Sequence, residues 1–215
     1  MDDAQFADRL KGWFHPSQKV DGQVLWNHGD DLLPWEPVIE QYNWYRRIGR
    51  WLKPKRILEV GVAFGYGTLS MMADLEDLPE VWWLDNESGW KGSVGYGRIQ
   101  MVDTYGADAC PRWYRSWEEF PDLTIAGRFD LIHIDANHEY EHVLHDLQQA
   151  ERFHDLYPHI ICHDTVDPPV SRAIDDYMRG SPPFRTVEMP QVRCGVRVIH
   201  RCKGVCRLEE GLANL

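Results

Sequence analysis

Residues 56–68, with the sequence RILEVGVAFGYGT, decide how this chain folds. The stretch begins with a short apolar run of strand-forming side chains, and residues 68–75 continue with helical spacing. Gly61, Gly65 and Gly67 therefore occupy the turn between a strand and a helix. Glycine lets backbone N–H groups approach a ligand closely, and the first turn of the helix offers further unpaired N–H groups. The stretch predicts a βα unit whose turn holds a nucleotide-like ligand.

The glycine spacing separates this turn from a dinucleotide-binding site. A dinucleotide site requires Gly-x-Gly-x-x-Gly, whereas this turn reads Gly-x-x-x-Gly-x-Gly behind a glutamate. The pattern resembles the first motif of class I S-adenosylmethionine-dependent methyltransferases, most closely the branch of catechol and caffeoyl-CoA O-methyltransferases. A plain βα turn with no ligand is the other interpretation. The resemblance implies that the loop holds the methionine part of the cofactor through Glu59, Gly61, Gly65, Tyr66, Gly67 and Thr68, with Gly67 inserted before the threonine.

Composition narrows the class of partner. The chain of 215 residues carries a net charge of -11 at pH 7, which argues against nucleic acid or an anionic membrane because both attract clustered Lys and Arg. Five cysteines without a Cys-x-x-Cys pair fit neither a disulfide framework nor a zinc knuckle. No stretch has the pattern of a signal peptide or a membrane span. We therefore expect a cytoplasmic protein with a small-molecule substrate.

Residues 1–50 do not follow the strand-helix repeat of the rest of the chain. We expect an N-terminal helical extension or lid, with a helix over residues 36–52, followed by one cofactor-binding domain over residues 51–215. The tryptophans of the extension cover either the sheet or a subunit contact in a homo-oligomer, or they belong to a lid over an acceptor site with His15 or His28 reaching inward. These tryptophans are Trp13, Trp26, Trp35 and Trp44.

Further strands follow at regular intervals, and several end in an acid. Residues 80–85 form the second strand and end in Asp85, which suits the ribose of a nucleotide. A glycine-rich helix over residues 88–105 and a weak third strand within residues 113–117 come next. The family resemblance places Ser116 and Trp117 of that segment beside the adenine.

The second half of the chain repeats the pattern more clearly. Residues 129–135 form the fourth strand and precede an amphipathic helix, and residues 159–164 form the fifth strand. A helix over residues 170–178 leads to two closing strands, 184–189 and 196–200, which pair antiparallel. With the resemblance, which covers about residues 50–200, this predicts an α/β fold: a Rossmann-like, seven-stranded, mostly parallel sheet with helices on both faces and an antiparallel last strand.

Glu59, Asp85, Asp135 and Asp164 end four of these strands, and parallel strands bring such ends to one edge of the sheet. Asp135 is thus expected to contact both the cofactor and the reacting groups. Asp135 and Asp164 could share Mg²⁺ or another divalent cation, because hard cations prefer carboxylate oxygens.

Around these two acids the sequence resembles the metal-supporting motifs of catechol-type and antibiotic-tailoring O-methyltransferases. That family usually carries Asp-Asn or an acidic pair after the fifth strand, whereas this chain has His163-Asp164-Thr165. Either His163 or Thr165 supplies the third ligand, or the metal site is incomplete. His138 occupies the position of the family's lysine base, and an imidazole accepts a hydroxyl proton near neutral pH. The other interpretations of His138 are a metal ligand and a histidine that simply lies at the start of a helix.

The reaction implied by the resemblance is methyl transfer to the hydroxyl of a phenol, sugar or natural product, with Asp135 and His138 as catalytic residues. Two other functions remain open. The segment His138-Glu139-Tyr140-Glu141-His142 matches the His-Glu-x-x-His motif of zinc hydrolases, which places two histidines on one helix face. A non-catalytic protein could also keep the glycine loop and bind the cofactor alone.

Overall fold

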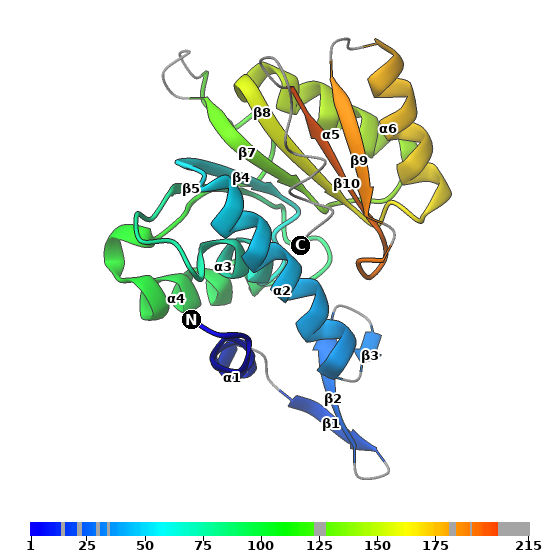
Figure 1. Ribbon diagram of the computed structural model, residues 1–215. Coiled ribbons are helices and arrows are strands. Elements are labelled where there is room, and N and C mark those ends of the chain that lie inside the picture. The colour runs from blue at the N-terminus through cyan, green and yellow to red at the C-terminus, as the bar shows by residue number, and fades with distance from the viewer. Residues whose placement is uncertain are drawn as a thin grey trace.

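A central sheet of seven strands organises the chain in the computed structural model (Figure 1). The structure describes residues 1–13, 16–20, 23–28, 31–33, 35–122, 128–180, 184–189 and 191–201, without the side chains of residues 16–37 and 157. The strand order is β6-β5-β4-β7-β8-β10-β9. The strands are β4 (Arg56–Val60), β5 (Glu80–Leu84), β6 (Arg112–Tyr114), β7 (Phe129–Ile134), β8 (His154–His163), β9 (Arg185–Met189) and β10 (Val196–His200).

The direction of the strands confirms the predicted α/β architecture. Strand β4 pairs in parallel with β5 and β7, and β5–β6 and β7–β8 are parallel as well. Strand β10 runs antiparallel to both of its neighbours, β8 and β9. The sheet is therefore Rossmann-like with a reversed last strand, and the two closing strands form the expected antiparallel pair.

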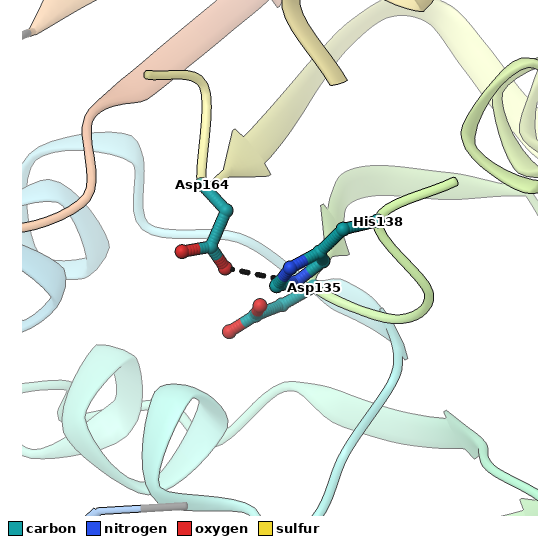
Figure 2. A group of neighbouring side chains, drawn as sticks. All are labelled: Asp135, His138 and Asp164. Carbon is teal, nitrogen blue, oxygen red and sulfur yellow. Dashed lines mark ion pairs between the residues drawn. The ribbon is translucent and has the colours of Figure 1, made fainter. Parts of the chain in front are cut away.

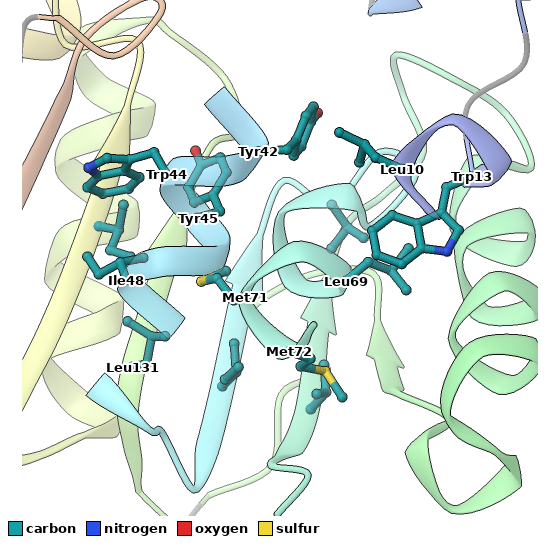
Figure 3. Close-up of a cluster of buried hydrophobic side chains, with 14 of the residues drawn as sticks. Leu10, Trp13, Tyr42, Trp44, Tyr45, Ile48, Leu69, Met71, Met72 and Leu131 are labelled. Atoms are coloured by element: carbon teal, nitrogen blue, oxygen red, sulfur yellow. The ribbon is translucent and has the colours of Figure 1, made fainter. Parts of the chain in front are cut away.

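Helices cover both faces of the sheet because successive strand residues point to opposite sides. Ile57 of β4 packs into a core with the helices of one face, and Leu58 packs into a second core with those of the other. The first face carries α1 (Asp3–Trp13), α2 (Trp35–Leu52), α3 (Tyr66–Met72) and α4 (Ser93–Tyr105). The second carries α5 (Tyr140–Phe153) and α6 (Pro168–Gly180). Figure 3 shows the first core, where tryptophan, tyrosine and methionine side chains of α1, α2 and α3 meet.

The N-terminal segment is not purely helical, which corrects one expectation. Between α1 and α2 lies a three-stranded antiparallel sheet of β1 (Pro16–Val20), β2 (Gln23–His28) and β3 (Asp31–Leu33). Such short strands carry too few residues to display a clear alternation of apolar and polar side chains. His15 and the side chain of His28 lie outside the described residues, so their inward position stays a prediction.

Some element boundaries also differ from the predicted ones. Helix α4 begins at Ser93 and not at residue 88, because Gly92 adopts a left-handed conformation with φ +84° just before the helix. Strand β8 begins five residues before the predicted position 159. Among the described helices, none has both the length and the apolar character that crossing a membrane requires.

Helix α2 is tied to α1 and to the segment after α3 by a buried cation, Arg46. The Arg46 side chain is 2% exposed, and its Nε lies 2.7 Å from Oδ2 of Asp74, which follows α3. Its Nη1 lies 2.8 Å from Oδ1 of Asp3 in α1. Arg46 therefore ties three segments together at the end of the first core.

Replacing Arg46 by alanine should lower the free energy of unfolding by about 2–3 kcal/mol, because the buried Asp74 carboxylate would lose its nearest cation. Asp74 would keep only the longer ion pairs with the Met1 amino group at 3.5 Å and with Arg50 at 3.7 Å. Chemical denaturation followed by circular dichroism measures this change. Arg47→Ala is the matched control, since Arg47 is 37% exposed and pairs with the exposed Asp3 at 3.2 Å. The control should cost less than about 1 kcal/mol, and equal losses in the two variants would contradict this role of Arg46.

Candidate active site

Glycine is required at two positions of the loop between β4 and α3. Gly61 has φ +78°, and a Cβ there would lie 2.2 Å from the backbone oxygen of Asp135. Gly65 has φ +73°, and a Cβ there would lie 2.6 Å from the Trp83 ring. Side chains rarely adopt this conformation, and neither position has room for one. The loop therefore packs directly against the end of β7 and against β5.

Asp85 holds this loop in place from the end of β5. Its Oδ2 accepts the backbone N–H groups of Val62 at 2.8 Å and Ala63 at 2.9 Å. Its Oδ1 accepts the N–H of Glu87 at 2.6 Å. A carboxylate offers about four lone-pair sites, so Asp85 can accept one further hydrogen bond from a ligand. Asp85, which is predicted to bind the ribose, thus also holds the glycine loop in place.

A cavity of about 440 Å³ opens beside this loop. Five of the predicted cofactor residues line it: Gly61, Asp85, Ser116, Trp117 and Asp135. Sequence reasoning missed its far wall, which includes Asn137, His142 and Asp146. The Trp117 indole donates to Oδ1 of Asp146 at 2.8 Å, and its ring stacks on Phe153 at 5.8 Å. The segment after β6 is therefore fixed at the cavity by α5.

A smaller cavity of about 120 Å³ continues from the first. The two share Gly61, Ala63, Trp90 and Asp135 in their linings. Besides Tyr66 and Gly67 of the loop, the smaller cavity is lined by three residues of α2 that sequence reasoning missed: Gln41, Tyr42 and Tyr45. Their spacing in the sequence places them on one face of a helix, and this spacing is the signal by which sequence reasoning could have found them. The N-terminal segment thus supplies one wall of this cavity.

Glu59 lies beneath the loop with 2% of its side chain exposed, and it lines the smaller cavity. It accepts a hydrogen bond from the Thr68 hydroxyl, and its Oε1 lies 3.0 Å from Nδ1 of His133. Thr68 is fully buried and, like Gly65, is absent from the linings of these two cavities. Glu59 and Thr68 therefore support the loop from within.

Asp135, His138 and Asp164 come together at the carboxyl ends of β7 and β8 (Figure 2). One ligand atom from each of them lies within 4.8 Å of the other two. Nε2 of His138 lies 3.0 Å from Oδ2 of Asp164. Two carboxylate oxygens and an imidazole nitrogen at this spacing can hold a divalent cation, with water completing the coordination.

His163 lies directly behind this group. Its Nδ1 is 2.8 Å from Oδ2 of Asp164 and 3.4 Å from Oδ1 of Asp135. The sequence offered His163 or Thr165 as the third ligand, whereas the cluster of candidate ligands contains His138 in that place. The backbone N–H of Thr165 donates to Gly195 at 3.3 Å.

The electrostatics of the group follow from these contacts. The hydrogen bond to Asp164 raises the pKa of His138 above its usual value, although partial burial acts in the opposite direction. Burial alone would raise the pKa of Asp164, but hydrogen bonds from His138 and His163 hold it well below the usual range. Burial likewise opposes protonation of His163, and the facing carboxylates of Asp135 and Asp164 raise its pKa well above the usual value. Asp164 is thus ionised, and its carboxylate faces two imidazoles.

The His-Glu-x-x-His segment does not form a helical zinc site. Helix α5 begins at Tyr140, so His138 precedes the helix and does not share its face with His142. Nε2 of His142 lies 3.6 Å from Glu139, while His138 belongs to the group with Asp135 and Asp164. The geometry therefore argues against the zinc hydrolase interpretation.

The sheet order, the glycine loop and the acids at the strand ends define an α/β enzyme that binds a nucleoside-containing cofactor. The family model described as "Methyltransferase domain" matches residues 58–165, which span half of the chain, and the protein belongs to this family. A comparison of the sequence with curated proteins found no match. The family confirms the methyltransferase part of the predicted resemblance.

Solved structures share the fold at low sequence identity. An O-methyltransferase from Bacillus cereus in complex with SAH is 14% identical, with a TM-score of 0.60 over 75% of this chain and 80% of that one. The O-methyltransferase TomG from Streptomyces achromogenes, in complex with SAM, is 11% identical, with a TM-score of 0.58 over 76% and 80%. The SAH-bound methyltransferase PaMTH1 from Podospora anserina is 20% identical, with a TM-score of 0.51 over 80% and 89%.

Proposed function

We propose that this protein is an S-adenosylmethionine-dependent O-methyltransferase that acts on the hydroxyl group of a small molecule. One observation carries the proposal: Asp135 belongs to both cavities and also to the group with His138 and Asp164. A cofactor lying along the two cavities would therefore bring its middle part next to the acid-base group. Methyl transfer requires this juxtaposition, because the donor carbon and the acceptor oxygen must meet in line.

The cavities suit S-adenosylmethionine in shape and chemistry. The larger one offers the Asp85 carboxylate for a ribose and the Trp117 segment for an adenine. Gly61, which lines both cavities, has no Cβ that would separate its backbone from a ligand. We assign the nucleoside to the larger cavity and the methionine end to the smaller one. The Bacillus cereus and Streptomyces achromogenes structures, described as complexes with SAH and SAM, support this cofactor.

His138 is the base of the proposed reaction. Its Nε2–H donates to Asp164 at 3.0 Å, which leaves Nδ1 as the basic atom, and 46% of its side chain is exposed, so an acceptor can reach the ring. His138 takes the hydroxyl proton of the acceptor, while Asp164 orients the imidazole and stabilises its charged form. When bound, S-adenosylmethionine supplies a sulfonium methyl group that is already electrophilic. The protein therefore has to orient the acceptor and accept one proton.

Asp135 and Asp164 would hold a divalent cation such as Mg²⁺, with water completing the coordination, while His138 stays free to act as the base. Such a cation would supply a positive charge that lowers the pKa of the acceptor hydroxyl. The donor set fits this assignment in atom type and spacing. Behind the cation, His163 would keep the two carboxylates apart.

Metal removal tests this part of the proposal. Treatment with a chelator should lower methyl transfer by about a hundredfold or more, because several kcal/mol of charge stabilisation would be lost and each ~1.4 kcal/mol is a factor of about ten. Added Mg²⁺ or Mn²⁺ should restore the rate in the wild type. In Asp164→Asn, the rate should be low and insensitive to chelator. A wild-type rate that the chelator leaves unchanged would contradict the metal site. Such a result would still be consistent with a methyltransferase that needs no metal.

The function itself is tested by incubation with S-adenosylmethionine and a panel of phenols, sugars and hydroxylated natural products. Mass spectrometry should detect one acceptor that gains a methyl group, together with an equal amount of S-adenosylhomocysteine. The position of the methyl group on oxygen follows from NMR of the product. Methylation of nitrogen or carbon atoms only would contradict O-methyl transfer.

A further inference from the structure

A third cavity lies between the first turns of α5 and α6. These helices follow the parallel strands β7 and β8 and lie side by side, so both begin at the edge of the sheet that carries Asp135 and Asp164 (Figure 1). The cavity has a volume of about 400 Å³ and is lined by Glu139, Tyr140, Glu141, Pro168, Pro169 and Arg172. None of these residues lines the two cavities assigned to the cofactor.

The third cavity adjoins the acid-base group. Glu139 follows His138 directly in the chain, and Pro168 follows Asp164 by four residues. Consecutive Cα atoms are about 3.8 Å apart, so the lining begins one residue from the imidazole. The two cofactor cavities reach the same group through Asp135. An acceptor that presents its hydroxyl to His138 can therefore place the rest of its structure in the third cavity.

Arg172 gives the α6 wall of this cavity a positive charge. Its guanidinium carbon lies 4.1 Å from the centroid of the Tyr140 ring, and the Tyr140 hydroxyl donates to Oδ2 of Asp176 at 2.8 Å. Asp176 is also paired with Arg179 at 2.6 Å. Within the described part of the chain, Arg172 has this ring contact but no carboxylate partner. A ring contact uses none of the five N–H donors of a guanidinium, so these donors are available to a ligand.

The wall from α5 has the opposite charge. Glu139 and Glu141 both line the cavity. The Glu139 side chain is 74% exposed, and its Oε2 lies 3.6 Å from Nε2 of His142. Glu141 forms no ion pair with any residue that the structure describes. The cavity thus has a cation on one helix and two carboxylates on the other.

Apolar surface lies between these charges. Pro168 and Pro169 have no backbone N–H, so the first two residues of α6 present ring carbons to the cavity. The Tyr140 ring adds an aromatic surface beside them. Apolar rings of this kind suit the flat ring of a ligand. Since the prolines offer no hydrogen-bond donors, Arg172 is the group of α6 that can recognise a negative charge here.

We propose that the third cavity binds the acceptor and selects a zwitterion, such as a hydroxylated aromatic amino acid. Arg172 binds the carboxylate of this acceptor, and Glu139 and Glu141 attract its ammonium group. This inference rests on the proposed function, in which the hydroxyl oxygen of the same molecule gains the methyl group, S-adenosylhomocysteine leaves, and the proton passes to His138. The chain carries a net charge of -11, so an acceptor carboxylate requires a local cation of this kind.

Four catechols test the proposal, because they share the same pair of ring hydroxyls and differ in the charge of the side chain. Dihydroxyphenylalanine carries a carboxylate and an ammonium, dihydroxyphenylpropionate only the carboxylate, dopamine only the ammonium, and methylcatechol neither. The full chain is assayed with S-adenosylmethionine, and kcat/KM is measured for each acceptor. We expect kcat/KM for dihydroxyphenylalanine to exceed that for methylcatechol by about tenfold or more, as for hydrogen bonds to charged groups.

Arg172→Gln removes the proposed partner of the carboxylate. It should lower kcat/KM about tenfold for dihydroxyphenylalanine and dihydroxyphenylpropionate, and change it less than about twofold for dopamine and methylcatechol. Arg152→Gln is the matched control. Arg152 lies over the Phe153 ring at 5.2 Å, its side chain is 57% exposed, and it is outside the cavity lining. This control should leave all four values within about twofold of the wild type.

Replacing Glu139 and Glu141 together by glutamine tests the other wall. The double variant should lower kcat/KM about tenfold for dihydroxyphenylalanine and dopamine, because both lose the partners of their ammonium group. The value for dihydroxyphenylpropionate should not fall, since the two acids repel its carboxylate. Glu151→Gln is the control, because Glu151 is an exposed acid of α5 outside the cavity lining.

Equal kcat/KM for the four catechols in the wild type would overturn the inference. A loss in Arg172→Gln that is the same for charged and uncharged acceptors would also overturn it. Binding of S-adenosylhomocysteine without methylation of any of the four would refute this choice of acceptor and leave the proposed function standing. A chain that binds no S-adenosylhomocysteine would instead contradict the proposed function.

Discussion

We expect His138→Gln to lower the rate of methyl transfer by about a hundredfold to a thousandfold, which is the range for removal of a general base. Glutamine keeps hydrogen-bonding atoms near Asp164 but cannot accept the acceptor's proton. Its affinity for S-adenosylmethionine should stay within about twofold of the wild type, because His138 is outside both cavity linings. Single-turnover kinetics and isothermal titration measure the two quantities separately.

His142→Gln is the control for this prediction. His142 is the same residue type four positions further along, its side chain is 60% exposed, and its Nε2 lies 3.6 Å from Glu139. Because His142 lines the larger cavity, the rate is measured at saturating S-adenosylmethionine; it should then change by less than about twofold, as expected for a residue outside the group of Asp135, His138 and Asp164. Equal losses in the two variants would contradict the assignment of His138 as the base and would revive the two-histidine zinc site.

The second large effect is expected from Gly61→Ala. The new methyl group would overlap the backbone oxygen of Asp135, 2.2 Å away, and the φ of +78° is strained for alanine. We expect the free energy of unfolding to fall by about 3 kcal/mol or more, from backbone strain and overlap together. The loop would move away from β7. A displacement of about 1 Å in such a site can cost a factor of about a hundred, so we expect S-adenosylmethionine to bind about a hundredfold more weakly.

Gly95→Ala provides the comparison. Gly95 lies within α4, and a Cβ there would meet nothing within 4 Å. Alanine in a helix interior stabilises by about 1 kcal/mol relative to glycine, so this variant should be slightly more stable than the wild type. Thermal denaturation of both variants, followed by titration at a temperature where each is folded, separates stability from binding. A Gly61→Ala protein that binds normally would show that the loop tolerates the side chain and does not approach the cofactor closely.

The sequence predicted those parts of the fold that depend on local pattern. Strands β4, β7 and β8 each contain a short run of branched apolar side chains, which is typical of buried parallel strands: Ile57-Leu58, Leu131-Ile132 and Ile160-Ile161. Gly61 and Gly65 marked a turn whose conformation excludes other residues. Asp135 and Asp164 marked strand ends, because strand interiors disfavour carboxylates that lack partners. These signals need no knowledge of the tertiary structure.

The remainder of the site depends on contacts between distant segments. Tyr45 lies 88 positions before His133 in the sequence, and no local pattern indicates their hydrogen bond. In the sequence His133 has the pattern of an ordinary strand residue, and its two ring nitrogens find their partners on other segments, Glu59 of β4 and Tyr45 of α2. Gln41 meets His163 only because α2 crosses the sheet over β8. Side chains of this kind are identified by packing and not by spacing.

The central claim is that the two cavities hold S-adenosylmethionine with its methyl group beside Asp135. Isothermal titration of the wild-type chain with S-adenosylhomocysteine, repeated with Gly61→Ala, tests it most directly. We predict one binding site per chain, with an affinity about a hundredfold weaker in the variant. No heat of binding for the wild type, or equal binding by both proteins, would contradict the account.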